Sequence, residues 1–266
     1  MSLRVAVGQL EASDDGVAGT QAALALVASA AQAGARLLVL PEYTLAWAPT
    51  LHTGLAQEHS RFVEALAAAA AEHRMWVVAG TLEPDGDRLR NVAVALGPDG
   101  AVVGRYTKVH LFDAFGVRES DVLEAGSPEA VVIDVDGWRV GLATCYDLRF
   151  PESFRVLVDA GADVLAVGAA WAAGEGKAEQ LDVLARARAL ENTAYLLLAS
   201  QCGRGRTGRS AVVGPLGDKL AAADERPQLL VADLDRERLE QVRATLPALQ
   251  HRRYAVAARE LVERDD

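Results

Sequence analysis

The feature that most constrains the fold is an alternation of short apolar runs with longer segments of helical period. Leu37 to Leu40 is an uninterrupted apolar run that Pro41 ends, and it is too short for a helix. Such a run is typical of a strand buried on both faces. Glu58 to His73, by contrast, repeats apolar residues at helical spacing. Strands that alternate with helices predict an α/β or α+β domain with a mixed sheet.

The same rhythm continues along the chain, without a linker-like stretch or an internal repeat. We expect the other helices over Gly16 to Ala33, Glu152 to Ala160, Lys177 to Asn192 and Asp235 to Leu246, the last capped by Asp235. Further strands are expected over Leu3 to Leu10, Trp76 to Thr81, Asn91 to Leu96, Ala101 to Tyr106, Val131 to Val135, Trp138 to Thr144, Val164 to Gly168, Ala194 to Ser200, Ser210 to Val213, Lys219 to Ala223 and Gln228 to Leu234. The sequence therefore predicts one domain over 1–253 and a tail over 254–266, whose charged run from Arg259 to Asp266 is expected to be solvated or frayed.

Charge and composition exclude several partners and compartments. The 266 residues carry a formal net charge of −10, which argues against nucleic acid or an anionic membrane as the main partner. The N-terminus lacks the basic and apolar regions of a signal peptide, and no apolar run reaches the ~18 residues of a membrane span. The only cysteines, Cys145 and Cys202, form no CxxC pair. We expect two reduced thiols in a cytoplasmic protein.

Motifs of several enzyme classes are missing from the sequence. It contains no G-x-S-x-G, no H-E-x-x-H and no G-x-G-x-x-G after the first strand. None of the five histidines pairs with another histidine or with a cysteine at metal-ligand spacing. The missing motifs therefore argue against a serine hydrolase, a metal hydrolase and a Rossmann oxidoreductase.

Residues that could act in catalysis follow the ends of three predicted strands, namely Glu42, Lys108 and Cys145. Ligand sites of α/β folds collect at strand ends, where an ammonium would stabilise a thiolate and a carboxylate would accept its proton. Each residue also has an ordinary reading: Glu42 as a cap, Lys108 as a solvated lysine and Cys145 as a small buried apolar side chain. The spacing of the three residues does not show that they converge, so a cysteine enzyme and these ordinary structural roles both remain open.

Five segments taken together resemble the nitrilase superfamily of carbon–nitrogen hydrolases, most of all its Nit-type and ω-amidase branch. They are Leu-Pro-Glu-Tyr at 40–43, Tyr-Thr-Lys-Val-His-Leu-Phe-Asp at 106–113, Ala-Thr-Cys-Tyr-Asp-Leu-Arg-Phe-Pro-Glu at 143–152, Arg-Ala-Arg-Ala-Leu-Glu-Asn at 186–192 and Gly-Arg-Ser-Ala-Val-Val-Gly-Pro-Leu-Gly at 208–217. They follow the family order and cover the chain from the first strand to about Arg253. The resemblance implies a four-layer α-β-β-α sandwich of two mixed sheets.

The same resemblance implies catalytic roles. Glu42 would be the general base, Lys108 the oxyanion stabiliser and Cys145 the nucleophile, with no metal or organic cofactor. A second glutamate stands between the lysine and the cysteine in many relatives. Glu119, in the context Arg-Glu-Ser, fits that place better than its competitor Glu124.

Substrate contacts are expected from the neighbours of these residues. Tyr43 and Phe112 would line the pocket or pack, and Tyr146 would supply a backbone N–H to the oxyanion. Arg149 would bind a substrate carboxylate, as related carbamoylases do, or form a structural salt bridge, and Asp147 is expected to be structural. Trp171 falls on a substrate loop, but Ala169 to Lys177 departs from the aromatic loop usual in this branch. Cys202 is expected to pack only.

The resemblance thus predicts an amidase that releases ammonia from a small carboxamide, such as an ω-amide, through a thioester. The alternatives are hydrolysis of N-carbamoyl amino acids, hydrolysis of nitriles, and a non-catalytic binding protein. The last would be favoured by loss of the glutamate, lysine or cysteine, and all three are present. A homodimer or higher homo-oligomer is expected, formed by the helix from Glu152 and the segment after Pro247.

Overall fold

Two mixed β-sheets form the centre of the computed structural model, which describes residues 2–258. The first sheet has the order β15 (Gln228–Asp235), β1 (Ser2–Gln9), β2 (Leu37–Val39), β3 (Trp76–Asp85), β4 (Arg88–Leu96) and β5 (Val102–Thr107), with β8 (Leu123–Glu124) paired to β4. The second has the order β14 (Lys219–Ala222), β13 (Ala211–Val213), β12 (Tyr195–Ser200), β11 (Val164–Ala169), β10 (Trp138–Thr144) and β9 (Val132–Val135). A small hairpin joins β6 (Asp113–Ala114) to β7 (Val117–Arg118).

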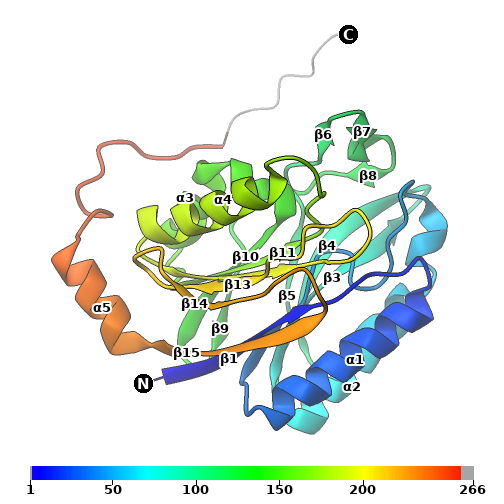
Figure 1. Ribbon diagram of the computed structural model, residues 1–266, viewed down its shortest axis with the longest axis horizontal. Helices are drawn as coiled ribbons and strands as arrows, with labels where there is room; N and C mark the ends of the chain where they lie inside the picture. Colours follow the sequence, from blue (N-terminus) through cyan, green and yellow to red (C-terminus); the bar gives the residue numbers. More distant parts are fainter. Residues whose placement is uncertain (1, 259–266) are drawn as a thin grey trace.

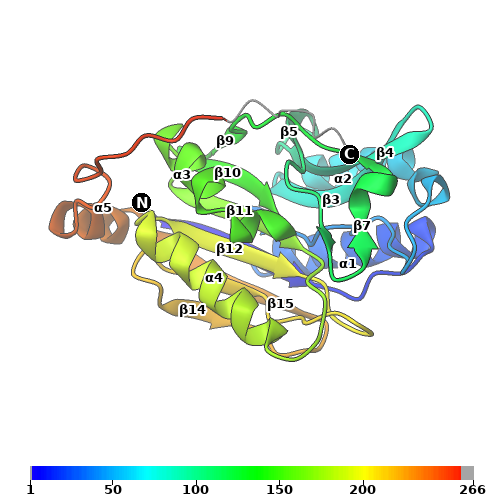
Figure 2. The ribbon, with the colours of Figure 1, turned by 90° about the horizontal axis from the view of Figure 1, so that it is seen from above.

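Helices cover the outer face of each sheet (Figure 1). α1 (Gly16–Gln32) and α2 (His59–His73) lie on the first sheet, and α3 (Pro151–Asp159) and α4 (Lys177–Glu191) lie on the second. A view turned by 90° shows the two helix pairs on opposite sides of the molecule, with α5 (Arg236–Thr245) at one end (Figure 2). This arrangement confirms the expected four-layer α-β-β-α sandwich.

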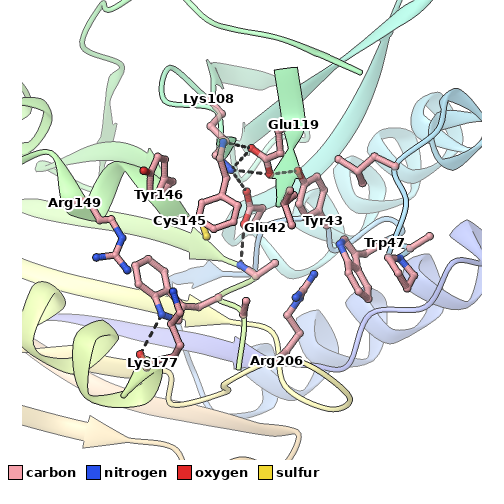
Figure 3. Close-up of a pocket in the computed structure, with 18 residues that line it drawn as sticks. Glu42, Tyr43, Trp47, Lys108, Glu119, Cys145, Tyr146, Arg149, Lys177 and Arg206 are labelled. Atoms are coloured by element: carbon pink, nitrogen blue, oxygen red, sulfur yellow. Dashed lines mark hydrogen bonds and ion pairs between the residues drawn. The ribbon is translucent and has the colours of Figure 1, made fainter. Parts of the chain in front are cut away.

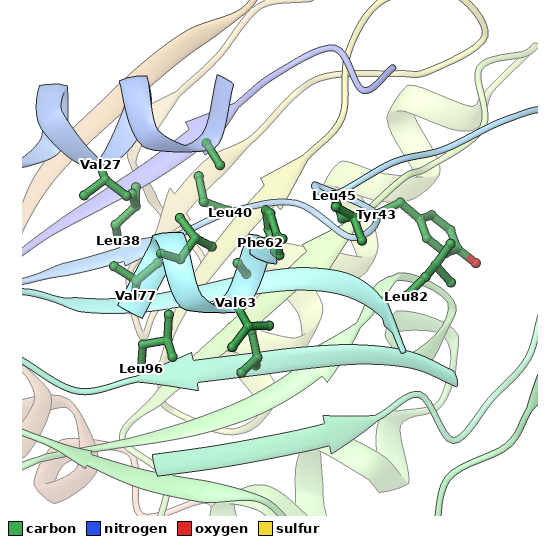
Figure 4. Close-up of a cluster of buried hydrophobic side chains, with 14 of the residues drawn as sticks. Val27, Leu38, Leu40, Tyr43, Leu45, Phe62, Val63, Val77, Leu82 and Leu96 are labelled. Carbon is green, nitrogen blue, oxygen red and sulfur yellow. The ribbon is translucent and has the colours of Figure 1, made fainter. Parts of the chain in front are cut away.

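Apolar side chains on the faces of the strands contribute to three hydrophobic cores, which lie between the four layers. In β2, the side chain of Leu38 joins the core beneath α1 and α2, whereas Leu37 and Val39 join the core between the two sheets. Successive side chains of a strand point to opposite faces, so a strand buried on both faces is apolar throughout. Figure 4 shows the core under α1 and α2, where Leu38 packs with Val27 and Phe62.

Strand direction brings distant residues to one edge of the first sheet. β2 runs parallel to β3, and β4 runs antiparallel both to β3 and to β5. β5 therefore points the same way as β2, and the residues that follow the two strands emerge at the same edge. Glu42 and Lys108 are among those residues.

Most of the expected elements are present, and the differences are local. β3 and β4 are longer than expected and form one hairpin, while β6, β7, β8 and the short turns η1 (Thr53–Ala56), η2 (Glu119–Asp121) and η3 (Cys145–Arg149) were not expected. Asp235 does cap α5, since its side chain accepts a hydrogen bond from Glu237 N at 3.0 Å. Residues 254–258 of the expected tail contain no helix or strand, and Arg259 to Asp266 lie outside the described residues.

Candidate active site

Three strand ends bring Glu42, Lys108 and Cys145 to one pocket (Figure 3). Lys108 follows β5, and its Nζ donates to Glu42 Oε1 at 2.8 Å and to Glu119 Oε2 at 2.8 Å. The lysine and Glu42 are each only 1% exposed. An ammonium is therefore held between two carboxylates, away from solvent.

Glu42 links the two sheets through its carboxylate. Oε1 accepts from Lys108 Nζ and from Asn91 Nδ2, both at 2.8 Å. Oε2 accepts at 2.8 Å from the backbone N–H of Ala170, which follows β11 in the second sheet. Gly168 permits this approach, because a Cβ built there would lie 2.9 Å from the backbone nitrogen of Glu42. The carboxylate has a fixed orientation as a result.

Cys145 begins η3 directly after β10, in a left-handed backbone conformation with φ of 46°. Asp147 stabilises this turn: its carboxylate accepts from Thr144 N at 2.8 Å and from the Tyr106 hydroxyl at 2.7 Å, and it lies 2.7 Å from His110 Nδ1. A non-glycine residue in this conformation is strained and persists only where its surroundings hold it. Asp147 is fully buried in this network, in agreement with its expected structural role.

The Cys145 side chain is a thiol in the resting site. Burial raises its pKa well above the ordinary value, the Glu42 carboxylate raises it further, and the Lys108 ammonium opposes both. A thiol becomes a strong nucleophile only when its proton leaves. Attack on a substrate therefore requires a base beside the sulfur, and Glu42 is the carboxylate that influences it most.

Lys108 is charged despite its burial. Desolvation alone would lower its pKa, but the carboxylates of Glu119 and Glu42 outweigh that effect and hold the pKa well above the ordinary value. Its contact with Glu119 is bifurcated, at 3.1 Å to Oε1 and 2.8 Å to Oε2. Because an ammonium has three donors, this sharing leaves one N–H for a further acceptor.

Glu119, not Glu124, lies beside the lysine. Its carboxylate also accepts from the Tyr43 hydroxyl and from Phe112 N, each at 2.8 Å. Burial would raise the pKa of Glu119, but Lys108 and these hydrogen bonds hold it below the ordinary value. Glu124 instead forms an ion pair with Arg88.

All five expected substrate contacts lie in the lining of a cavity of about 230 Å³ beside Cys145, namely Tyr43, Phe112, Tyr146, Arg149 and Trp171. Arg149 has no carboxylate partner among residues 2–258; its Nη2 donates to Gln180 Oε1 at 2.8 Å, and its guanidinium lies 4.9 Å from the Trp171 ring centroid. The structural salt bridge considered for Arg149 is thus absent from this part of the chain. Its charge faces the cavity (Figure 3).

Several lining residues were not anticipated from the sequence, among them Trp47, Lys177 and Arg206. Arg206 comes from the Gly-Arg-Gly-Arg segment, which had the composition of a flexible surface loop. Two arginines in an otherwise acidic protein were its only signal.

Cys202 lies outside this cavity. It lines a second cavity of about 390 Å³ together with Gln201, Glu11 and Arg204. Burial raises the pKa of its thiol to about 11, so the side chain stays protonated near neutral pH. Its side chain is 1% exposed, and a packing role for Cys202 stays a prediction.

The family model described as "Carbon-nitrogen hydrolase" matches residues 4–244. The chain belongs to the carbon–nitrogen hydrolase family. It is accordingly a hydrolase of the amidase type, and the resemblance seen in the five motif segments is confirmed.

Individual relatives agree with the family. The chain is 38% identical over 256 residues to a protein of Escherichia coli O157:H7 named deaminated glutathione amidase, covering 94% of this chain and 97% of the relative. The NitFhit protein of C. elegans superposes with a TM-score of 0.88 at 29% identity, over 95% of this chain and 65% of that one. An amidase from Nesterenkonia sp. AN1, solved as a double mutant with acrylamide, gives a TM-score of 0.82 at 27% identity over 94% of each chain.

Within residues 2–258, no group of three or more His, Cys, Asp or Glu side chains is arranged to hold a metal ion. No helix in the same range is long and apolar enough to cross a membrane.

Proposed function

We propose that this hydrolase cleaves a small amide that carries a carboxylate, with Cys145 as nucleophile, Glu42 as general base and Lys108 as oxyanion stabiliser. The observation that carries the proposal is the buried ammonium of Lys108, which contacts the carboxylates of Glu42 and Glu119 at 2.8 Å in the cavity that also contains Cys145. A carboxylate, a thiol and a fixed positive charge together are the parts required for acyl transfer through sulfur.

The first half of the reaction forms a thioester. Glu42 accepts the Cys145 proton while Sγ attacks the amide carbon. The oxyanion accepts hydrogen bonds from the remaining N–H of Lys108 and from the backbone N–H of Tyr146, and such donors typically contribute about 3–4 kcal/mol each. Glu42 returns the proton to the nitrogen, the C–N bond breaks, and ammonia or an amine leaves.

The second half consumes water. Glu42 or Glu119 takes a proton from a water molecule that attacks the thioester carbon, the C–S bond breaks, and the carboxylic acid departs as the thiol is restored. No metal or organic cofactor takes part in these steps. Glu119 also holds Lys108 in position through its two contacts with the ammonium.

The lining favours an anionic substrate. It carries four cations, Lys108, Arg149, Lys177 and Arg206, but only two carboxylates, Glu42 and Glu119. This local excess of positive charge stands against a net charge of −10 for the whole chain. An ω-amide of a dicarboxylate and an amide like deaminated glutathione both fit, and the relative from E. coli is named for the latter.

A release assay tests the proposal against its rivals. Ammonia and primary amines are measured from ω-amides, a deaminated-glutathione-like amide, N-carbamoyl amino acids and nitriles. We expect turnover of carboxylate-bearing amides that Cys145→Ala abolishes and Cys202→Ala preserves. Preferred turnover of carbamoyl compounds would move the assignment to that class, and no release by the wild type from any compound would contradict it.

We further propose that one domain spans 1–253 and that the protein is a cytoplasmic homodimer or higher homo-oligomer, assembled through α3 and the segment after Pro247. In support, Arg252 of that segment forms an ion pair with Asp159 of α3, so the two lie together. Sedimentation velocity tests the assembly: a monomer at micromolar concentration would contradict it.

A further inference from the structure

The cavity contains three cations whose charge no carboxylate of the described chain neutralises. Arg149, Lys177 and Arg206 each rest on an aromatic ring instead, at 4.9 Å from Trp171, 3.7 Å from Phe115 and 3.8 Å from Trp47 respectively. Most arginines elsewhere in residues 2–258 pair with a carboxylate, as Arg4 does with Asp233 at 2.9 Å. The three cations therefore keep their charge available to a ligand.

One edge of the Arg206 guanidinium, formed by Nε and Nη2, has no hydrogen-bond acceptor in the described chain. Its Nη1 donates to the backbone carbonyl of Gly205 at 3.1 Å. Its Nε is buried without a partner, and no residue of the described chain accepts a hydrogen bond from its Nη2. The Nε–H and Nη2–H groups of a guanidinium point along one edge and match the two oxygens of a carboxylate. A buried donor left unpaired costs free energy, which a ligand carboxylate would recover.

The backbone around Arg206 is held in place by the loop that carries Trp171. Thr207 donates to the carbonyl oxygen of Trp171 from both its backbone nitrogen and its Oγ1, each at 3.0 Å. Ala173 N donates to Gly205 O at 3.0 Å. The guanidinium thus belongs to a loop fixed by hydrogen bonds and packs on the Trp47 ring. Binding of a ligand would therefore cost little conformational entropy of this side chain.

Arg206 and Arg149 flank the nucleophile from opposite sides (Figure 3). Arg149 lies on the side of Trp171 and Lys177, whereas Arg206 lies on the side of Trp47. All of them line the same cavity as Cys145. An extended ligand whose amide carbon reaches the sulfur would place one end near each arginine.

We propose that Arg206 is a specificity-determining residue, which binds a substrate carboxylate through Nε and Nη2 on the side of the cavity opposite Arg149. The substrate class that follows is an amide with a carboxylate on each side of the scissile bond. This inference rests on the proposed function, because it takes the amide carbon to lie at Cys145.

Three amides test the inference. N-glutarylglycine carries a carboxylate on both sides of the amide, N-glutarylethylamine carries one on the acyl side only, and N-pentanoylglycine carries one on the amine side only. Release of primary amine gives kcat and KM for the wild type, Arg206→Met, Arg206→Lys and Arg149→Met. Arg204→Met is the matched control, since Arg204 is an exposed arginine of the same loop and does not line the active-site cavity.

Arg206→Met is expected to lower kcat/KM about 10- to 100-fold, mainly through KM, for N-glutarylglycine and for one of the two singly charged amides. The other singly charged amide should change less than twofold, and Arg149→Met should show the converse selectivity. Arg206→Lys should recover part of the loss, and Arg204→Met should match the wild type. Equal effects of Arg206→Met on all three amides, or no effect on any, would overturn the inference.

Failure of the proposed function would give a different result, namely no amine release by the wild type from any probe. The same probes are then titrated calorimetrically into Cys145→Ala and Cys145→Ala/Arg206→Met proteins. Weaker binding of N-glutarylglycine to the second protein, with one singly charged probe unaffected, supports the role of Arg206. Equal affinities of the two proteins for every probe overturn it.

Discussion

Lys108 Nζ lies 2.8 Å from Glu42 Oε1, and both side chains are almost completely buried. The ion pair joins a residue that follows β2 to one that follows β5, 66 positions later in the chain. Burial of such a pair is costly unless further hydrogen bonds satisfy both partners, and here Asn91, Ala170 and Glu119 supply them. We therefore expect the ion pair to serve catalysis more than it stabilises the fold. Because loss of one partner would leave a buried charge unpaired, substitution of either residue should have a large effect.

Glu42→Gln should separate the reactivity of Cys145 from turnover. The Glu42 charge contributes to the raised pKa of the thiol, so its removal lowers that pKa and increases the thiolate population. Alkylation of Cys145 by iodoacetamide at pH 8 should become faster, while kcat for amide hydrolysis falls by about 10²–10⁴ because the base is lost. Both rates are measured in a Cys202→Ala background. Slower alkylation together with unchanged hydrolysis would contradict the role of Glu42.

Lys108→Met should leave two buried carboxylates without their shared cation. Removing one partner of a buried ion pair typically costs about 3–5 kcal/mol, so we expect a comparable loss in the free energy of unfolding at pH 7. Without Lys108, burial raises the pKa of Glu119 in the folded state. Urea unfolding should therefore show the deficit shrinking as the pH falls towards 5. A pH-independent deficit would argue against charge as its cause.

Glu119→Gln should lower activity about 10²-fold or more, whereas Glu124→Gln, a change of the same kind in an ion pair with Arg88, should stay within about twofold of the wild type. The pKa of Glu119 in the folded protein lies below its ordinary value of 4.5, so its charge adds stability above that pH. This contribution disappears as the pH falls through the lower, folded-state pKa.

Unfolding experiments on wild type and Glu119→Gln check the sign of this effect. The wild type should be the more stable protein at pH 7, and the difference should diminish below about pH 4.5 as Glu119 becomes protonated. A difference that grows on acidification would show that the carboxylate is not stabilised by Lys108.

Gly168→Ala tests the close approach of the two sheets at Glu42. The new Cβ would lie 2.9 Å from Glu42 N, so the backbone must shift, at a typical cost of about 1–3 kcal/mol, and the carboxylate should move away from Cys145. We expect lower thermal stability and lower kcat. Gly54→Ala is the control, because its Cβ would meet side-chain atoms of His52 and Gln57 and no backbone, and the His52 ring can turn away. Equal effects of the two substitutions would exclude a specific role for the Gly168 contact.

Local sequence pattern was sufficient to predict an α/β or α+β domain with a mixed sheet, whereas the four layers were expected from the family resemblance. A strand such as β2 is apolar on both faces because it borders two cores, and that signal lies within a few residues. The hairpin of β6 and β7 carried no such signal, because each strand has only two residues and several are exposed. Its position depends on Glu119, whose backbone N–H donates to Phe112 O at 3.3 Å.

The site was predictable only where a motif marked it. Glu42, Lys108 and Cys145 stand in recognisable segments, but their convergence depends on strand order, which spacing does not reveal. Arg206 was missed for a physical reason: its loop has the glycine-rich, charged composition of a solvated turn. Its burial comes from long-range hydrogen bonds between Thr207 and Trp171, 36 positions away in the chain.

Mass spectrometry of the acyl-enzyme is the sharpest test of Cys145 as the nucleophile. A turned-over amide is mixed with the enzyme, the reaction is quenched in acid within its first turnovers, and the intact protein and its peptides are weighed. We predict a mass increase equal to the acyl group, located on Cys145 and retained in Cys202→Ala. Hydrolysis that continues in Cys145→Ala, or an acyl group located on a residue other than Cys145, would contradict it.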